Sequence, residues 1–202
     1  MARTGRPRGF DREAALEAAM RLIWQHGYEG ASLDALRTAM GGISSASFYA
    51  AFKSKEALYH EALRSYLDSY GQVLSPLYDR GLPPRERVEQ ALRASARMQT
   101  DPEHPPGCMV TLSATIGSPQ SDVLRQTTRH EREANREAIA RAVQLAVEEG
   151  SLRPEAGEGG LAALLDITLN GLSLVARDGA TAAKLEGAVD AAMKVWDSYS
   201  AR

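Results

Sequence analysis

The apolar residues of this chain recur at helical spacing almost from end to end, and this periodicity constrains the fold more than any other feature. Near the N-terminus, for example, Ala15, Leu16, Ala19 and Leu22 fall on one stripe of a helix. Alternating runs of β-branched residues, which would predict half-buried strands, are absent. We therefore predict an all-α fold.

Helix-capping residues divide this pattern into segments. A side-chain oxygen just before a helix accepts hydrogen bonds from its first backbone N–H groups, and we assign this role to Asp11, Ser32, Ser44, Ser54 and Thr181. Glycines end helices, and we place such ends at Gly27 and Gly150. Nine helices are predicted, at residues 12–26, 33–40, 45–51, 55–74, 84–99, 108–116, 119 or 122 to 149, 161–177 and 182–199. Residues 154–160 are predicted to be a linker.

Composition excludes several classes of protein. The chain has 202 residues, 44% of them hydrophobic and 25% charged, which indicates a globular protein of one or two domains. A single cysteine cannot form an intrachain disulfide. The longest apolar stretch, 161–176, contains Asp166 and Asn170 and is short for a membrane span. No secretory signal is visible, so we expect a cytoplasmic protein without membrane contact.

Charge is divided unevenly along the chain. The formal net charge is −2 overall, but residues 1–60 carry +2 and the remainder carries −4. The segment "ARTGRPRG" contributes three arginines among small residues with no apolar anchor. An arginine-rich N-terminus is more often a solvated tail, but such a flexible basic arm can also follow the minor groove of DNA.

The second and third predicted helices, joined by Gly41-Gly42-Ile43, match the helix-turn-helix pattern. A major groove roughly 12 Å wide admits one helix, provided its side chains are small. On the third helix, Phe48 and Phe52 are four residues apart and are expected to face the core. Capped short helices also occur in helical proteins that bind no DNA, but with the charge division we favour DNA binding. The candidate DNA-binding residues are Arg6, Arg8, Ser32, Ser44, Ser45, Ala46, Ser47, Tyr49 and Lys55.

The segments "GYEGASLDAL" and "SSASFYAAFKSKEALYHEAL" resemble the DNA-binding region of the TetR (tetracycline repressor) family. The chain departs from the family pattern in having two glycines, Gly41 and Gly42, where one is usual. The resemblance implies nine helices, a homodimer, and a repressor that a small effector releases from a palindromic operator. The predicted helices change from short to long near Phe52 to Leu58, so we divide the chain into a flexible arm at 1–9, a helix-turn-helix domain at 10–55 and an effector-binding and dimerisation domain at 56–202.

The last two predicted helices are candidates for a dimer interface. The first of them is apolar nearly all round and the second is rich in alanine, so either an ordinary monomer core or a four-helix interface between protomers fits. The family resemblance favours the interface, with candidate residues Leu161, Leu165, Leu169, Leu172, Leu185, Val189 and Trp196. The connecting sequence "ARDGA" also resembles a subgroup of the family.

The segment "PPGCMVTLSA" resembles the sixth helix of the same subgroup. Cys108 is expected at a helix N-terminus, a position that lowers the pKa of a thiol. Some relatives that sense quinones and electrophiles carry a reactive cysteine near this place. A lone cysteine is more often a small buried residue, which we favour; the other hypothesis is that Cys108 borders the effector pocket and senses oxidants.

The effector pocket is expected among the predicted helices from the fourth to the eighth. Its candidate residues are Tyr66, Tyr70, Met98, Cys108, Met109, Leu112, Arg132 and Asn170. No catalytic set, phosphate loop or metal-ligand spacing is visible, so we expect neither an enzyme nor a cofactor or metal. A helical small-molecule binding protein without DNA activity is the alternative function.

Overall fold

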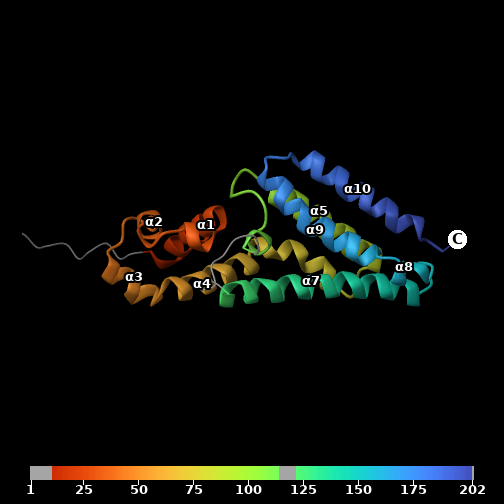
Figure 1. Cartoon of the computed structure of the whole chain (residues 1–202), viewed down its shortest axis with the longest axis horizontal. Coiled ribbons are helices and arrows are strands. Elements are labelled where there is room, and N and C mark those ends of the chain that lie inside the picture. Colours follow the sequence, from red (N-terminus) through yellow and green to blue (C-terminus); the bar gives the residue numbers. More distant parts are fainter. Residues whose placement is uncertain (1–10, 114–121, 202) are drawn as a thin grey trace, which may run out of the picture.

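The computed structural model describes residues 11–113 and 122–201, and Figure 1 shows them as an elongated bundle of helices. The all-α prediction is confirmed: the described residues form ten α-helices and one 3₁₀-helix. Beyond these, they form a single isolated bridge, between Leu152 and Ser200.

The first three helices form a small head at one end of the molecule (Figure 1). They are α1 (Arg12–Gly30), α2 (Leu33–Ala39) and α3 (Ser45–Phe52). The predicted caps are confirmed, because Asp11, Ser32 and Ser44 each accept a hydrogen bond from the backbone of the helix that follows. The predicted stop at Gly27 is a kink, with φ 73° and ψ 169°, after which the chain resumes one further helical turn.

The fourth helix is shorter than its apolar pattern predicted. Ser54 caps α4 (Lys55–Asp68) as expected, but the helix ends at Ser69, whose φ of −117° and ψ of −89° are not helical. The chain continues as a 3₁₀-helix, η1 (Tyr70–Tyr78), which contains Pro76. The predicted continuation of the α-helix to Leu74 is therefore wrong, because the non-helical backbone of Ser69 interrupts it.

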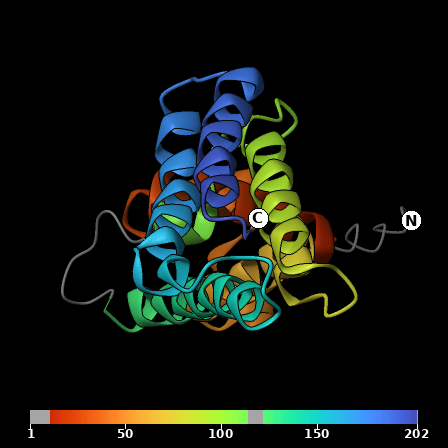
Figure 2. The same ribbon diagram turned by 90° about the vertical axis from the view of Figure 1, so that its right-hand side faces the viewer.

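The remaining helices form the body. They are α5 (Pro84–Gln99), α6 (Met109–Leu112), α7 (Asp122–Glu148), α8 (Glu155–Glu158), α9 (Leu161–Arg177) and α10 (Ala182–Ser198). In Figure 2, α5, α9 and α10 stand side by side above α7. The predicted linker at 154–160 contains α8, and the predicted end of the sixth helix at 116 lies outside the described residues.

Two apolar cores hold the chain together. One joins α1 to α4 with Met109, Val110 and Leu124, and the other joins α5, α7, α9 and α10. The first core therefore extends past residue 55, because α4 buries Leu58, Ala62 and other side chains among the head helices.

Three arginines on α5 form ion pairs with acids on α10. Arg85 pairs with Asp197 at 2.7 Å, Arg93 with Asp190 at 2.7 Å, and Arg97 with Glu186 at 3.3 Å. We call these pairs the α5–α10 ladder. They run along the length of both helices and fix how one lies against the other.

Candidate nucleic-acid interface and ligand cavity

Helix α3 presents one apolar face to the core and one face of small residues to solvent. Phe48 and Phe52 are 0% and 1% exposed, as their spacing predicted. The side chains of the opposite face are exposed: Ser45, Ala46, Ser47, Tyr49 and Ala50. A short helix with this surface can enter the major groove of DNA, where serines reach base edges or phosphates.

The second glycine is accommodated in the turn before α3. Gly41 and Gly42 have φ of 87° and 73°, values that favour glycine. The turn folds back on α2, because the N–H groups of Gly42 and Ile43 both donate to the carbonyl of Arg37. The Arg37 side chain in turn donates to the carbonyl of Ile43 at 2.9 Å. The longer turn is thus closed by hydrogen bonds, and α3 still directs its phenylalanines into the core.

The candidate phosphate ligands lie at helix N-termini. The Ser32 hydroxyl accepts from Ala35 N–H at 3.1 Å, and Ser44 accepts from Ser47 N–H at 3.1 Å. Both serines are exposed. At such termini, backbone N–H groups and the helix dipole favour an anion.

The Lys55 side chain, at the start of α4, is half-buried against α1. Its ammonium lies 4.4 Å from the ring centre of Tyr28, a cation–π contact. Burial lowers the pKa of Lys55, while nearby Glu29 raises it. Arg6 and Arg8, the other predicted basic contacts, lie outside the described residues.

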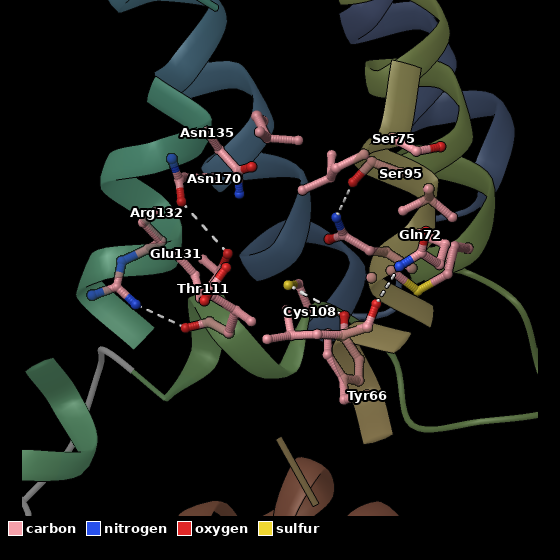
Figure 3. A pocket seen from close by; sticks show the side chains of 18 of the residues that line it. Tyr66, Gln72, Ser75, Ser95, Cys108, Thr111, Glu131, Arg132, Asn135 and Asn170 are labelled. Atoms are coloured by element: carbon pink, nitrogen blue, oxygen red, sulfur yellow. Dashed lines mark hydrogen bonds between the residues drawn. The ribbon is translucent and has the colours of Figure 1, made fainter. Parts of the chain in front are cut away.

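A cavity of about 320 Å³ lies between α4, η1, α5, α6, α7 and α9. Five of the eight predicted effector residues line it: Tyr66, Met98, Cys108, Arg132 and Asn170. Figure 3 shows Arg132 and Asn135 reaching it from α7, and Gln72 and Ser75 from η1 on the opposite side.

The other three predicted pocket residues lie elsewhere. Met109 and Leu112 line a second cavity of about 460 Å³, next to α1. Tyr70 is not on the wall of either cavity; its hydroxyl accepts from Arg21 at 2.9 Å. The end of α4 explains this difference, because Tyr70 belongs to η1 and does not continue the stripe of Tyr66.

Cys108 lies on the cavity wall beside the Tyr66 hydroxyl, which donates to its Sγ at 3.3 Å (Figure 3). Burial, followed by the neighbouring Cys108, raises the pKa of Tyr66 well above its ordinary value, so the hydroxyl is the donor. Helix α6, which follows Cys108, has four residues.

Gly107 fits its place because it has no side chain. Its φ is 84°, and an added Cβ would lie 2.8 Å from the Ser173 carbonyl oxygen and 2.9 Å from Leu112 Cδ1. The next N–H, of Cys108, donates to Ser173 Oγ at 2.8 Å. Helix α9 therefore holds this stretch of the cavity wall in position.

Two buried polar residues of the cavity were missed by sequence reasoning. Ser95 and Gln99 line it and are 2% and 1% exposed. Both fall on the apolar stripe of α5 that includes Val88 and Leu92. A polar residue on an otherwise apolar stripe is the sequence feature that could have identified them as residues of a buried polar site. Gln99 Nε2 donates to Ser95 Oγ at 2.6 Å.

Arg132 and Glu131 bring opposite charges to the same cavity wall. Arg132 donates to the carbonyl of Val110 at 2.8 Å, and Figure 3 shows its guanidinium turned outward, away from Cys108 and Tyr66. Burial, together with Arg129 and Arg136, lowers the pKa of Arg132. Across residues 11–113 and 122–201, no group of three acidic, histidine or cysteine side chains could hold a metal ion.

Trp24 of α1 joins the head to this cavity wall. Its indole N–H donates to the Gly107 carbonyl at 3.1 Å. Its ring stacks on His104 at 4.6 Å and meets Tyr66 edge-on at 4.9 Å between centroids. Arg177, at the end of α9, donates to the carbonyl of Gln25. The head is thus bonded to residues directly next to the cavity.

The candidate dimer residues lie inside the protomer. Their exposed fractions run from 0% to 8%, for Leu161, Leu165, Leu169, Leu172, Leu185, Val189 and Trp196. Leu169 also lines the cavity. The exposed apolar side chains of α9 and α10 are on another face: Leu164, Ile167, Leu174, Val175 and Val195. We call this second set of exposed side chains the α9–α10 face.

Family models match both parts of the chain. One described as "Bacterial regulatory proteins, tetR family" matches residues 15–62, and one described as "Tetracyclin repressor-like, C-terminal domain" matches residues 84–196. In the described part of the chain, no helix is long and apolar enough to cross a membrane.

Curated relatives and solved structures agree with these matches. The HTH-type transcriptional repressor ComR of Escherichia coli (strain K12) is 32% identical over 197 residues, which are 95% of this chain and 91% of ComR. The repressor BdcR of the same organism is 32% identical over 117 residues, 58% of this chain and 59% of BdcR. A cysteine mutant of the TetR family regulator CifR, solved with 26-bp operator DNA, has 38% identity and a TM-score of 0.83, covering 95% of this chain and all of CifR. This chain belongs to the TetR family of bacterial regulatory proteins and is a DNA-binding transcriptional regulator.

Proposed function

We propose that this protein is a repressor that binds a palindromic operator as a homodimer and leaves it when a small molecule enters the 320 Å³ cavity. The observation that carries the proposal is the hydrogen bond from Trp24 of the head to Gly107, the neighbour of Cys108 on the cavity wall. A ligand that moves this wall changes the position of α1, and with it α3.

The surface of α3 supports the DNA-binding part. Its exposed face offers small residues to base edges, and Ser32 and Ser44 offer hydroxyls to phosphates. The arm with Arg6 and Arg8 adds positive charge for the minor groove. The CifR structure, which is a complex with operator DNA, and the repressor ComR support the same use of this chain. In this role the protein acts in the cytoplasm.

The α9–α10 face supports the homodimer. Ile167 is 68% exposed and Leu174 is 55% exposed, although the opposite face of the same helix is buried. Between them, Gly171 leaves room for a partner helix to approach closely. Pairing α9 and α10 of two protomers gives a four-helix interface around a two-fold axis, which matches the symmetry of a palindrome.

We also propose that the chain belongs to the subgroup with a Gly-Cys pair before the sixth helix and an Ala-Arg-Asp-Gly-Ala turn. The structure gives a physical reason for the glycine in each motif. Gly107 has no room for a Cβ, and Gly179 in the turn has a φ of 88°. Arg177 of the same turn donates to Gln25 in the head.

Substitutions on α3 and α4 test the DNA-binding part. Tyr49→Ala and Lys55→Ala are expected to weaken binding to all DNA sequences in gel shifts. The Lys55 variant is expected to lower the slope of log affinity against log salt by about 1, because one phosphate contact is lost.

Arg141→Ala is the control, since it removes a cation from the exposed side of α7, away from the head, and is expected to leave DNA binding unchanged. Selection from randomised DNA is expected to enrich a two-fold symmetric site. Unchanged binding in both head variants would contradict the assigned interface, and failure to enrich any site would favour a small-molecule binding protein without DNA activity.

A further inference from the structure

We infer that the molecule recognised in this cavity is a compact, neutral, largely apolar alcohol or phenol whose hydroxyl donates a hydrogen bond to Gln99 Oε1. The inference rests on the proposed function, because it takes the cavity to be the effector site. It adds the chemical class of the effector and the residue that selects it.

The Gln99 side-chain amide is held in place through its nitrogen, and its oxygen, Oε1, is left without a hydrogen bond from the described residues. The residue is 1% exposed, and its Nε2 donates to Ser95 Oγ at 2.6 Å. Its backbone carbonyl accepts from Gly107 N–H at 2.9 Å, which fixes the end of α5 against the cavity wall. Within the described part of the chain, Oε1 has no hydrogen-bond partner.

A buried amide oxygen without a partner destabilises a protein, because it has lost its hydrogen bonds to water and gained none in return. Gln99 lines the cavity, so a molecule bound there can supply the missing bond. Because Oε1 only accepts, the bound group has to be a donor, such as an O–H. A molecule that offers only acceptors would leave Oε1 unpaired and would place a second acceptor near it.

The rest of the wall restricts the size and charge of the ligand. A cavity of about 320 Å³ lies at the small end of the range of ligand sites, roughly 300–1,000 Å³. Much of its wall is apolar, including Leu67, Leu74, Met98 and Val110. The charges of Glu131 and Arg132 are opposite and adjacent, and the Arg132 guanidinium is directed outward (Figure 3). These features favour a neutral molecule over an ion.

The test compares two probes that differ in the donor alone, cyclohexanol and cyclohexanone. Dissociation constants are measured by thermal-shift titration of the full chain without DNA. Wild type is expected to bind cyclohexanol about tenfold more tightly, the size expected for one buried hydrogen bond against an unpaired acceptor.

Three variants assign this preference to the amide. Gln99→Leu removes the acceptor and is expected to bring the two probes to equal affinity. Ser95→Ala releases Nε2, so the amide can offer a donor and the preference is expected to move toward cyclohexanone. Gln90→Leu makes the same change as Gln99→Leu at an exposed position of α5 and is expected to keep the preference of wild type.

Equal binding of the two probes to wild type would overturn the inference, as would a preference that survives in folded Gln99→Leu, or binding of neither probe. Operator release is measured separately, by adding each probe to the complex of protein and DNA. A Gln99-dependent preference without operator release would support the chemistry of the site and contradict the proposed effector role. The two proposals can therefore fail independently.

Discussion

Lys53 adopts a backbone conformation that favours glycine. Its φ is 65°, and no other non-glycine residue among those described has a positive φ. It lies at the C-terminal end of α3, where its N–H donates to the Tyr49 carbonyl. Glycine is the usual residue at such a helix end, because a Cβ crowds the backbone there.

Lys53→Gly is therefore expected to raise the free energy of unfolding by about 1 kcal/mol. Lys53→Ala keeps the Cβ and removes the charge, so it is expected to leave stability nearly unchanged. Urea denaturation of the two variants measures the difference. If the alanine variant gains as much as the glycine variant, relief of backbone strain is not the cause.

Among single residues, those that contact their own neighbours along the chain were the best predicted from sequence. The caps at Ser32, Ser44, Ser54 and Thr181 followed from sequence, because each hydroxyl bonds to a backbone group three residues away. Gln99 was missed because its environment is formed by segments far apart in the chain. No local pattern places η1, α6 and α7 around the end of α5.

At the scale of elements, the α5–α10 ladder makes stability depend on pH. The hydrogen bond from Arg85, followed by its charge, lowers the pKa of Asp197 from the ordinary value of 3.8. A carboxylate with a depressed pKa in the folded state stabilises that state above its unfolded pKa. The contribution is lost as pH falls through the folded pKa, so it weakens below about pH 4.

Asp197→Asn removes this carboxylate and is expected to lower the melting temperature slightly at pH 7. The effect is small because the Asp197 side chain is 50% exposed and the pair is screened by solvent and salt. The variant is also expected to lose less stability than wild type between about pH 5 and pH 3. If the melting temperatures of the two proteins fall by the same amount between these pH values, the pH dependence does not come from Asp197.

Element types were predicted better than element ends. The apolar pattern of α4 continues through Tyr70 and Leu74 because both side chains are partly buried against the two cores, although they belong to the 3₁₀-helix. What ended the α-helix was the backbone of Ser69, whose hydroxyl bonds back to the Ser65 carbonyl at 2.6 Å. A serine hydroxyl can bond to a backbone carbonyl one turn back both inside a helix and at its end, so the sequence alone did not determine where α4 ends.

At the scale of the whole molecule, α9 explains why the predicted interface residues are buried within the protomer. A helix that is apolar nearly all round has two buried faces, one inside the protomer and one against a partner, and sequence periodicity does not distinguish them. The structure assigns Leu165 and Leu172 to the first face and leaves Ile167 and Leu174 exposed. The division of domains at residue 55 stays a prediction, and the first apolar core crosses it.

A charge on the α9–α10 face is expected to separate the protomers. Ile167→Glu adds a carboxylate at the most exposed large apolar side chain of this face, where dimer formation would bury it unpaired. Sedimentation analysis is expected to show a dimer for wild type and a monomer for the variant. Ala140→Glu, on the exposed side of α7, is the matched control and should remain dimeric. A dimeric Ile167→Glu protein would place the interface elsewhere.

The peptide unit of Gly107 and Cys108 lies between the ligand cavity and the head, which bears on how the ligand specificity of this regulator can be changed. Gly107 accepts a hydrogen bond from Trp24 of the head, and the next residue, Cys108, lines the cavity, so this peptide unit is one of the links between the two. Gly107 also donates its N–H to the backbone carbonyl of Gln99, and a substitution of the Gln99 side chain leaves this backbone bond in place. We therefore expect ligand specificity and operator response to be separable, so that substitutions on α5 change the first while the Trp24 contact keeps the second.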